Sequence, residues 1–332
     1  MPDVISRREV LTGAAALALT AAAPALAQTS AGAAGKPDTL RVGKAIFSSF
    51  PFATLDVGTD AGIWKSLNLD IQDSDFKGDA QVQQAFTAGG VDIGLGSGPS
   101  MVYRSKGVPA IAVAVMAGRP LDMALVVAKG STIKSLAALK GQRVGVTTAG
   151  SLTDWLARQI ASDQGWGPDG VNVLPMGAME TRISALDSGQ IQASVHDLTE
   201  AYEIERVGKG TILTLFGDIV KDFDTHVIFA SDTMVGQRAP VLQRFLKGWF
   251  TTVAYMRKNR DATIKTVARV LQVDESVVAK SYPADMSMMS SDGTFSQAAL
   301  DEVRKSVADL GMYDGTLDPK NMYTTRFVPV KV

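Results

Sequence analysis

The chain contains no cysteine and only two histidines among its 332 residues. The absence of cysteine excludes disulfides, thiolate catalysis, cysteine-ligated metals and a lipid anchor on cysteine. His196 and His226 do not have the spacing of a metal-binding helix, so we expect neither a metal nor a cofactor. A serine hydrolase is also disfavoured, because the sequence has no G-x-S-x-G motif and few histidines to act as a base.

The chain also lacks an excess of charge of either sign. Lys and Arg number 33 against 34 Asp and Glu, which gives a net charge of −1. Such a chain has no basic field for nucleic acid or for an anionic membrane. Beyond the N-terminal region no apolar run is long enough to span a bilayer. With 46% apolar residues, the length allows a soluble protein of two domains.

The N-terminus has the pattern of an export signal. Ser6–Leu11 resembles the twin-arginine motif but departs from it at Val10, where Phe is usual. An apolar run follows, and Ala25-Leu26-Ala27 fits the A-x-A cleavage pattern. We therefore expect a twin-arginine-type signal peptide over 1–27, a flexible linker over 28–37, and a periplasmic protein.

The rest of the chain alternates between strand-like and helix-like segments. This order predicts parallel sheets with helices on both sides. The expected strands are 39–46, 69–71, 91–95, 109–116, 123–128, 143–147, 171–176, 191–195, 211–216 and 225–230. The expected later helices are 242–256, 262–271, 275–281 and 297–310. Arg182, inside an earlier helix, is expected on a solvated face.

Two short segments are similar to each other. Residues 88–95 read AGGVDIGL and residues 188–195 read SGQIQASV. In each, a helix ends at a small residue and Gly, and a strand begins two residues later. The similarity favours two α/β units of similar layout.

The stretch from Lys140 to Trp166 carries the clearest binding pattern. A strand leads into small hydroxyl and glycine residues, and a helix with an apolar face follows. Ser151 and Asp154 have the spacing of a capping box. The free N–H groups of the first helical turn suit a carboxylate, sulfonate or phosphate. The alternative is an ordinary capped helix that binds only water.

Four segments together resemble periplasmic solute-binding proteins of ABC importers. They are LRVGKAIFSSFPF, FKGDAQVQQAFTAGGVDIGLGSGPS, TIKSLAALKGQRVGVTTAGSLTDWLARQI and ALDSGQIQASV. The resemblance covers roughly residues 38–260 and is to the sulfonate, taurine and nitrate receptors, a group that includes receptors for thiamin-precursor pyrimidines.

The resemblance implies the type II periplasmic binding protein fold. Its two doubly wound α/β lobes are joined by a two-stranded hinge, here near 119–125 and 224–228. Lobe 1 would comprise 38–121 plus 226–332, with the C-terminal helices packed on it, and lobe 2 would comprise 122–225. The implied partners are a membrane permease and ATPase, and the implied state is a monomer.

Ligands of open α/β sheets sit beyond the carboxyl ends of the strands. The candidate ligand-binding residues are Ser48, Ser49, Phe50, Gly78, Ser97, Gly98, Arg119, Thr147, Thr148, Ser151, Leu152, Thr153, His196 and Asp197. Arg119 would pair with an anion or form a surface ion pair. If Asp197 faces the solute, a zwitterion or an amine-bearing heterocycle fits better than a plain anion.

The leading interpretation is a non-enzymatic receptor that delivers a small anionic or zwitterionic organic solute to an ABC importer. A receptor for a pyrimidine or other heterocycle is the alternative. The sequence does not distinguish a transport receptor from a receptor that presents its closed form to a membrane sensor. An enzyme on the same fold, similar to yeast-type thiamin pyrimidine synthases, is disfavoured. Those enzymes carry a cysteine-rich iron-binding segment, and this chain has no cysteine.

Overall fold

The computed structural model describes residues 35–167, 169–313 and 321–332. The expected signal peptide and most of the expected linker lie outside the described residues. From Lys36 onward the chain forms one compact unit. None of the described helices has the length and hydropathy needed to cross a membrane.

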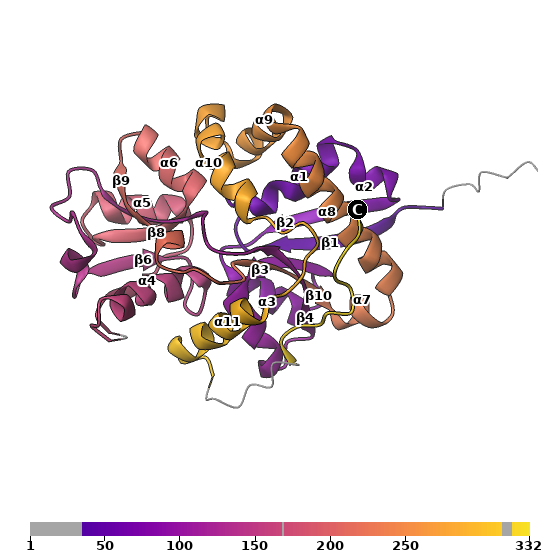
Figure 1. The fold of residues 1–332 in the computed structure, drawn as a ribbon, viewed down its shortest axis with the longest axis horizontal. Coiled ribbons are helices and arrows are strands. Elements are labelled where there is room, and N and C mark those ends of the chain that lie inside the picture. Colours follow the sequence, from indigo (N-terminus) through magenta and orange to yellow (C-terminus); the bar gives the residue numbers. More distant parts are fainter. Residues whose placement is uncertain (1–34, 168, 314–320) are drawn as a thin grey trace, which may run out of the picture. The chain divides into compact units, whose positions relative to one another are not determined.

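Two five-stranded sheets organise this unit (Figure 1). The first sheet has the order β2 (Leu69–Asp75), β1 (Asp38–Lys44), β3 (Ile93–Ser97), β10 (His226–Ser231) and β4 (Ala110–Ala117). The second has the order β7 (Asn172–Pro175), β6 (Arg143–Val146), β8 (Ala193–Asp197), β5 (Met123–Ala128) and β9 (Gly210–Leu215). Every strand expected from the sequence is present within a few residues, and the type II fold is confirmed.

The expectation of parallel sheets holds for only part of each sheet. In the first sheet β10 runs antiparallel to β3 and β4, and in the second β5 runs antiparallel to β8 and β9. Each of these two strands is the first that the chain forms after it arrives from the other sheet, so it enters from the opposite direction. The connecting segments are 118–122 and 216–225, and Thr225 N–H donates to the Gly118 carbonyl at 3.3 Å. Much of the range expected as hinge strands is therefore incorporated into β5 and β10.

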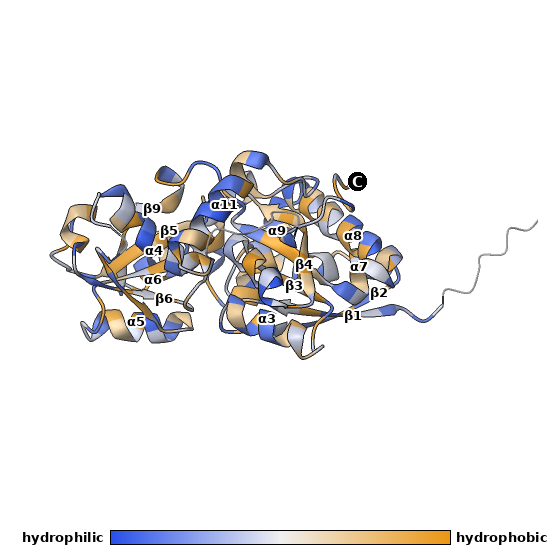
Figure 2. Ribbon diagram, turned by 90° about the horizontal axis from the view of Figure 1, so that it is seen from below, coloured by the Kyte–Doolittle hydropathy of each residue, from blue (hydrophilic) through white to orange (hydrophobic). Residues whose placement is uncertain are grey.

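The helices cover the sheets with one apolar side each, and Figure 2 shows hydrophobic and hydrophilic residues alternating along them. On α8 the expected stripe of Leu242, Phe245, Trp249 and Val253 is buried. The α-helices are α1 (Thr54–Asp60), α2 (Ile63–Ser66), α3 (Asp79–Thr87), α4 (Leu152–Asp163), α5 (Met179–Asp187), α6 (Leu198–Arg206), α7 (Asp232–Gly236), α8 (Ala239–Lys258), α9 (Arg260–Leu271), α10 (Glu275–Met288) and α11 (Gln297–Asp309). The 3₁₀ helices are η1 (Pro51–Ala53), η2 (Gly98–Lys106), η3 (Leu136–Leu139) and η4 (Phe216–Asp218).

The two similar sequence segments occupy equivalent places in the two sheets. Gly89 and Gly189 both have positive φ, of 66° and 71°, after α3 and α5. Arg41 on β1 donates to the Gly89 carbonyl at 2.7 Å, and Arg143 on β6 donates to the Gly189 carbonyl at 2.9 Å. The same contact recurs at the same place in both sheets, which supports the predicted duplicated layout.

The C-terminal helices contact elements of both sheets rather than one. Helix α10 packs against α9 and α6, and α11 packs against η2 and α4. The hydroxyls of Thr199 on α6 and Ser281 on α10 are 2.8 Å apart and buried. Helix α10 also continues past its expected end, through Pro283 to Met288. Pro283 has no N–H for the Ala279 carbonyl, and Arg260 Nη2 donates to that carbonyl at 3.5 Å.

Candidate functional site

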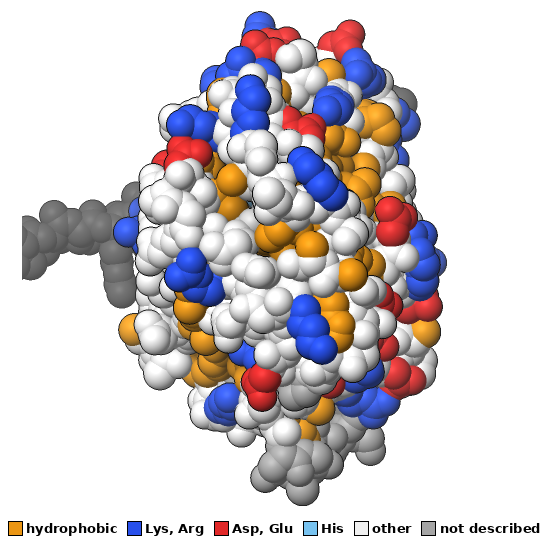
Figure 3. Space-filling view, turned by 90° about the vertical axis from the view of Figure 1, so that its left-hand side faces the viewer, with side chains coloured by type: hydrophobic (Ala, Val, Ile, Leu, Met, Phe, Trp, Pro, Cys, Tyr) orange, Lys and Arg blue, Asp and Glu red, His pale blue; other side chains and the backbone are white. Residues whose placement is uncertain are grey.

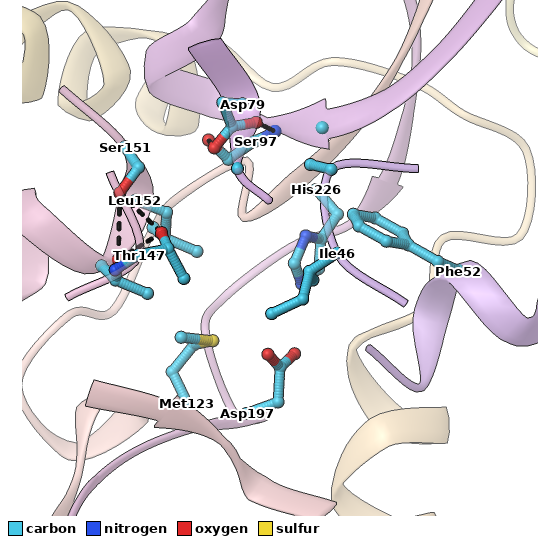
Figure 4. A pocket seen from close by; sticks show the side chains of 14 residues that line it. Ile46, Phe52, Asp79, Ser97, Met123, Thr147, Ser151, Leu152, Asp197 and His226 are labelled. Atoms are coloured by element: carbon cyan, nitrogen blue, oxygen red, sulfur yellow. Dashed lines mark hydrogen bonds between the residues drawn. The ribbon is translucent and has the colours of Figure 1, made fainter. Parts of the chain in front are cut away.

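A small pocket lies where strands of the two sheets end (Figure 4). Its volume is about 40 Å³, which is room for about three water molecules. Residues around the first sheet supply Ala45, Ile46, Phe52, Gly78, Asp79, Gly96, Ser97 and His226. Residues around the second sheet supply Met123, Thr147, Ser151, Leu152, Thr153 and Asp197.

Half of the fourteen candidate residues line this pocket. They are Gly78, Ser97, Thr147, Ser151, Leu152, Thr153 and Asp197. All of them follow or end strands, as the expectation for an open α/β sheet requires. The structure thus brings together loops that the sequence separates by more than a hundred positions.

The other candidates lie outside the pocket lining. Phe50 packs edge-on against Tyr282, with ring centroids 6.2 Å apart. Ser49 is buried, and its hydroxyl has no hydrogen-bond partner among the described residues. Thr148 contacts Gly78, where an added Cβ would lie 2.4 Å from Thr148 Cγ2. This pair is a close approach between a loop of the first sheet and a loop of the second.

Two further candidates, Arg119 and Gly98, contact the connecting segment 216–225 and do not line the pocket. Arg119 donates to the Gly217 carbonyl through Nη2 and, at 2.7 Å, through Nε. At Gly98 an added Cβ would lie 2.3 Å from the Asp224 carbonyl oxygen, so only glycine fits there. Arg119 is thus committed to a backbone carbonyl and adds no positive charge to the pocket lining.

The candidate list left out several lining residues, namely Ala45, Ile46, Phe52, Asp79, Gly96, Met123 and His226. For Asp79 a signal existed, because it directly follows the candidate Gly78 at the start of α3. Its carboxylate accepts from Ser97 N and Ser97 Oγ, both at 2.9 Å. The apolar members carry no such signal, because their patterns are those of ordinary core residues.

One end of the pocket is the N-terminus of α4. Ser151 caps the helix by accepting from Asp154 N at 3.4 Å, as the capping-box spacing predicts. The hydroxyls of Thr147, Ser151 and Thr153 lie 2.8–3.1 Å from one another. The first-turn N–H groups of Leu152 and Thr153 have no intrahelical acceptor and stand at the positive end of the helix dipole. This end suits an oxyanion.

The other end of the pocket is acidic. Asp197 and His226 line it, and His226 Nε2 is 2.9 Å from Asp122 Oδ2. Burial raises the pKa of Asp197 to about 8, with further contributions from the negative charges of Glu200 and Asp122. Burial alone would lower the pKa of His226, but the Asp122 carboxylate outweighs it and the pKa is raised. None of the described lining residues is Lys or Arg.

A buried polar network lies behind this acidic end. Glu200 accepts from Arg182 Nη2 at 3.2 Å and from the Ser48 hydroxyl, and it lies 2.8 Å from His196 Nδ1. Arg182 also donates to the Val195 carbonyl. With only 1% of its surface exposed, Arg182 is not on a solvated face, and that expectation was wrong. His196, a candidate ligand residue, belongs to this network, and its Nε2 lies 2.5 Å from Ser194 Oγ.

The buried network predicts that the free energy of unfolding falls in acid, and that His196→Gln makes this fall smaller. Burial and the charge of Arg182 lower the pKa of His196 from 6.5 to about 4. Between those values the unfolded chain binds a proton that the folded chain does not, so stability falls as the pH falls. Urea unfolding from pH 7 to pH 4 should therefore show the advantage of the wild type over His196→Gln shrinking by about 3 kcal/mol. Asp197 titrates in the opposite sense in both proteins and so cancels in the comparison. A pH-independent difference would contradict the prediction.

No curated protein matches the chain. A solved protein from Bordetella bronchiseptica RB50 is 22% identical, with a TM-score of 0.75 over 88% of this chain and 96% of that one. The alkanesulfonate-binding protein SsuA from Xanthomonas axonopodis pv. citri is 17% identical, with a TM-score of 0.70 over 89% and 97% of the two chains.

The ligand-binding component of an ABC-type import system from Staphylococcus aureus, solved with zinc bound, is 15% identical. Its TM-score is 0.75 over 89% of this chain and 99% of that one. At these identities the similarity establishes the fold, which agrees with the two mixed sheets described above. The family model "NMT1/THI5 like" matches residues 50–276, which is more than half of the sequence. The chain therefore belongs to the NMT1/THI5-like family.

Proposed function

We propose that this chain is an extracytoplasmic solute-binding receptor that delivers a small zwitterionic or anionic organic solute to an ABC importer. The observation that carries the proposal is the pocket between the strand ends of the two sheets, which draws its lining from both. A solute held there contacts both halves of the molecule at once. Binding is then favoured when the halves are close together, which is the condition for a ligand to drive closure.

The two ends of the pocket differ in the charge that they favour. The N-terminus of α4 and its three hydroxyls favour an oxyanion. Asp197 on the opposite side holds its proton when the pocket is empty, because burial raises its pKa to about 8, and a positive group bound beside it favours the ionised carboxylate. A compact zwitterion such as an amino-sulfonate satisfies both ends. An amine-bearing heterocycle such as a pyrimidine is the second candidate, because Asp197 accepts from a ring amino group equally well.

The boundaries proposed for the two lobes are 38–121 plus 226–332 for lobe 1 and 122–225 for lobe 2. The connecting segments 118–122 and 216–225 then act as the hinge, and Thr148 against Gly78 is one contact made on closure.

Figure 3 shows the end of the molecule around the second sheet, where basic, acidic and hydrophobic side chains are interspersed. We place the receptor in the periplasm as a monomer, exported by the twin-arginine-type signal, with a permease and ATPase as partners and no catalytic role.

A thermal-shift screen tests the receptor function and should reveal a stabilising solute. The compounds are taurine, alkanesulfonates, nitrate, carboxylates, amino acids and pyrimidines. A solute at one hundred times its dissociation constant stabilises the folded state by about 2.7 kcal/mol. Thr153→Val, which removes one hydroxyl of the α4 end, should weaken the binding of that solute about tenfold, as expected for a lost hydrogen bond to an anion.

The matched control for this screen is Thr59→Val on α1, whose hydroxyl donates to the Leu55 carbonyl of its own helix. This control should bind the solute as the wild type does. Mass spectrometry of material released on denaturation shows whether the starting protein is free of solute. Solute-free protein that responds to none of these compounds would count against the proposed solute classes.

A further inference from the structure

The geometry points to a binding site for one divalent transition-metal ion, of the class of Zn²⁺, formed by Asp122, Asp197 and His226 at the acidic end of the pocket. The three residues come from a connecting segment, the end of β8 and the start of β10. One donor atom from each lies within 4.8 Å of the others. The site stands on these residues, and only its role toward the solute rests on the proposed function.

Each of the three side chains has a buried polar atom without a hydrogen-bond partner in the described part of the chain. These atoms are Asp122 Oδ1, Asp197 Oδ1 and His226 Nδ1. The side chains are 1%, 8% and 5% exposed, and Figure 4 shows the Asp197 carboxylate directed into the pocket toward His226. Buried polar atoms are nearly always paired, so unpaired atoms on all three side chains of one cluster indicate a missing partner. The Ser49 hydroxyl lies close enough to interact with Asp197, and His226 meets Asp122 through Nε2, so Asp122 Oδ1 and His226 Nδ1 are the atoms left without any partner among the described residues.

The surrounding charges favour a cation as that partner. Asp197 interacts with the negative charges of Glu200 and Asp122, and Asp285 interacts with those of Asp122 and Asp197. The nearby Arg182 is engaged with Glu200. His226 is the positive partner of Asp122. One imidazole faces several buried carboxylates, which are costly to bury together, and a bound cation removes much of the cost that remains.

The donor set selects the class of metal. One imidazole nitrogen and two carboxylate oxygens suit zinc and its neighbours, which commonly take three protein ligands and leave one position open. Calcium and magnesium prefer oxygen ligands in larger number. Two ligand atoms of a tetrahedral zinc ion lie about 3.4 Å apart, because each is about 2.1 Å from the metal. Donors up to 4.8 Å apart must therefore move together to complete the site.

A metal here changes what the pocket accepts. The open coordination position would face the cavity, since Asp197 and His226 both line it. The ion would neutralise the acidic end and offer a second positive centre to an oxyanion besides the His226 imidazole, in a lining that contains no Lys or Arg. A sulfonate-like or carboxylate solute would then be held between the ion and the N-terminus of α4.

Isothermal titration of zinc into the protein tests the site. The protein is purified without a histidine tag and stripped with a chelator, and we expect one Zn²⁺ per chain. Asp197→Asn and His226→Gln should each weaken zinc binding by at least about 100-fold, the upper range for loss of an outer-shell partner. Asp224→Asn is the matched control, because Asp224 is also buried with an unpaired oxygen but is not one of the three ligands, and it should bind zinc as the wild type does.

Visible absorption of Co²⁺-loaded protein tests the same site without relying on the heat of binding. The bands of a tetrahedral site should appear in the wild type and in Asp224→Asn and be absent in Asp197→Asn, with circular dichroism confirming that each variant is folded. No zinc binding by the wild type, or unchanged binding in both ligand variants, would overturn the site. Binding of methylammonium but not zinc, lost in Asp197→Asn, would also overturn it and assign an amine to the acidic end.

The solute screen, repeated with stripped and zinc-loaded protein, separates this inference from the proposed function. A solute that binds while zinc does not would reject the metal and retain the receptor. Zinc that binds while no solute does would retain the metal site and reject the receptor role for these compounds.

Discussion

Arg182→Met is expected to lower the free energy of unfolding by about 3–5 kcal/mol, the range for removing one partner of a buried ion pair. Arg182 and Glu200 are 1% and 2% exposed, and they meet at 3.2 Å. Methionine fills a similar volume, so the main effect is a buried Glu200 carboxylate that has lost its positive partner. The Val195 carbonyl in the middle of β8 loses a donor as well. Urea unfolding at pH 7 measures the change.

The control for this experiment is Arg158→Met. Arg158 pairs with Asp154 at 2.8 Å, but its side chain is 30% exposed. Water screens such a pair, so the expected change is at most about 1 kcal/mol. Equal and small effects for both variants would mean that the buried Glu200 carboxylate is not stabilised by its pair with Arg182.

Trp155→Ala should also destabilise the protein by about 3–5 kcal/mol, as large-to-small changes at buried aromatic residues do. Trp155 is fully buried on α4 and stacks on Phe223 of a connecting segment, with ring centroids 4.5 Å apart. Its Nε1 donates to Asp309 of α11 at 3.2 Å. The indole therefore joins a helix of the second sheet to the connecting segment and to a C-terminal helix.

Asp309→Asn separates packing from hydrogen bonding at this site. The variant keeps the indole and leaves an acceptor for its N–H, so the expected loss of stability is below about 1 kcal/mol. Thermal unfolding of both variants in parallel measures the difference. A loss of stability in Asp309→Asn as large as in Trp155→Ala would show that the hydrogen bond to Asp309, and not the stacking on Phe223, accounts for the contribution of Trp155.

The sequence was sufficient to locate the strands and helices, because the signals for these elements are local. Hydrophobic alternation located the strands, and the two similar segments at Gly89 and Gly189 located two equivalent helix ends. Local patterns do not encode which strands become neighbours. The insertion of β10 between β3 and β4, and of β5 between β8 and β9, depends on where the chain crosses between sheets. For that reason the direction of these two strands was not predictable.

The same limit applies to the site. Gly78, Ser97 and the loop before α4 were predictable, because turns and caps at strand ends have local signatures. His226 and Asp122 were not, since their hydrogen bond joins residues 104 positions apart. Arg182 reads as a surface residue from its helix, and only the fold brings Glu200 to it.

The place of β10 in the first sheet has a consequence for the order of folding. All strands of the second sheet come from the continuous stretch between Met123 and Leu215, so that sheet is complete once this stretch has been synthesised. The first sheet begins earlier, but until His226–Ser231 arrives it consists of β2, β1 and β3 on one side and an unattached β4 on the other. Two unpaired strand edges then face water, the condition in which nascent chains associate wrongly. The half of the protein that is made first is thus the half that is finished last.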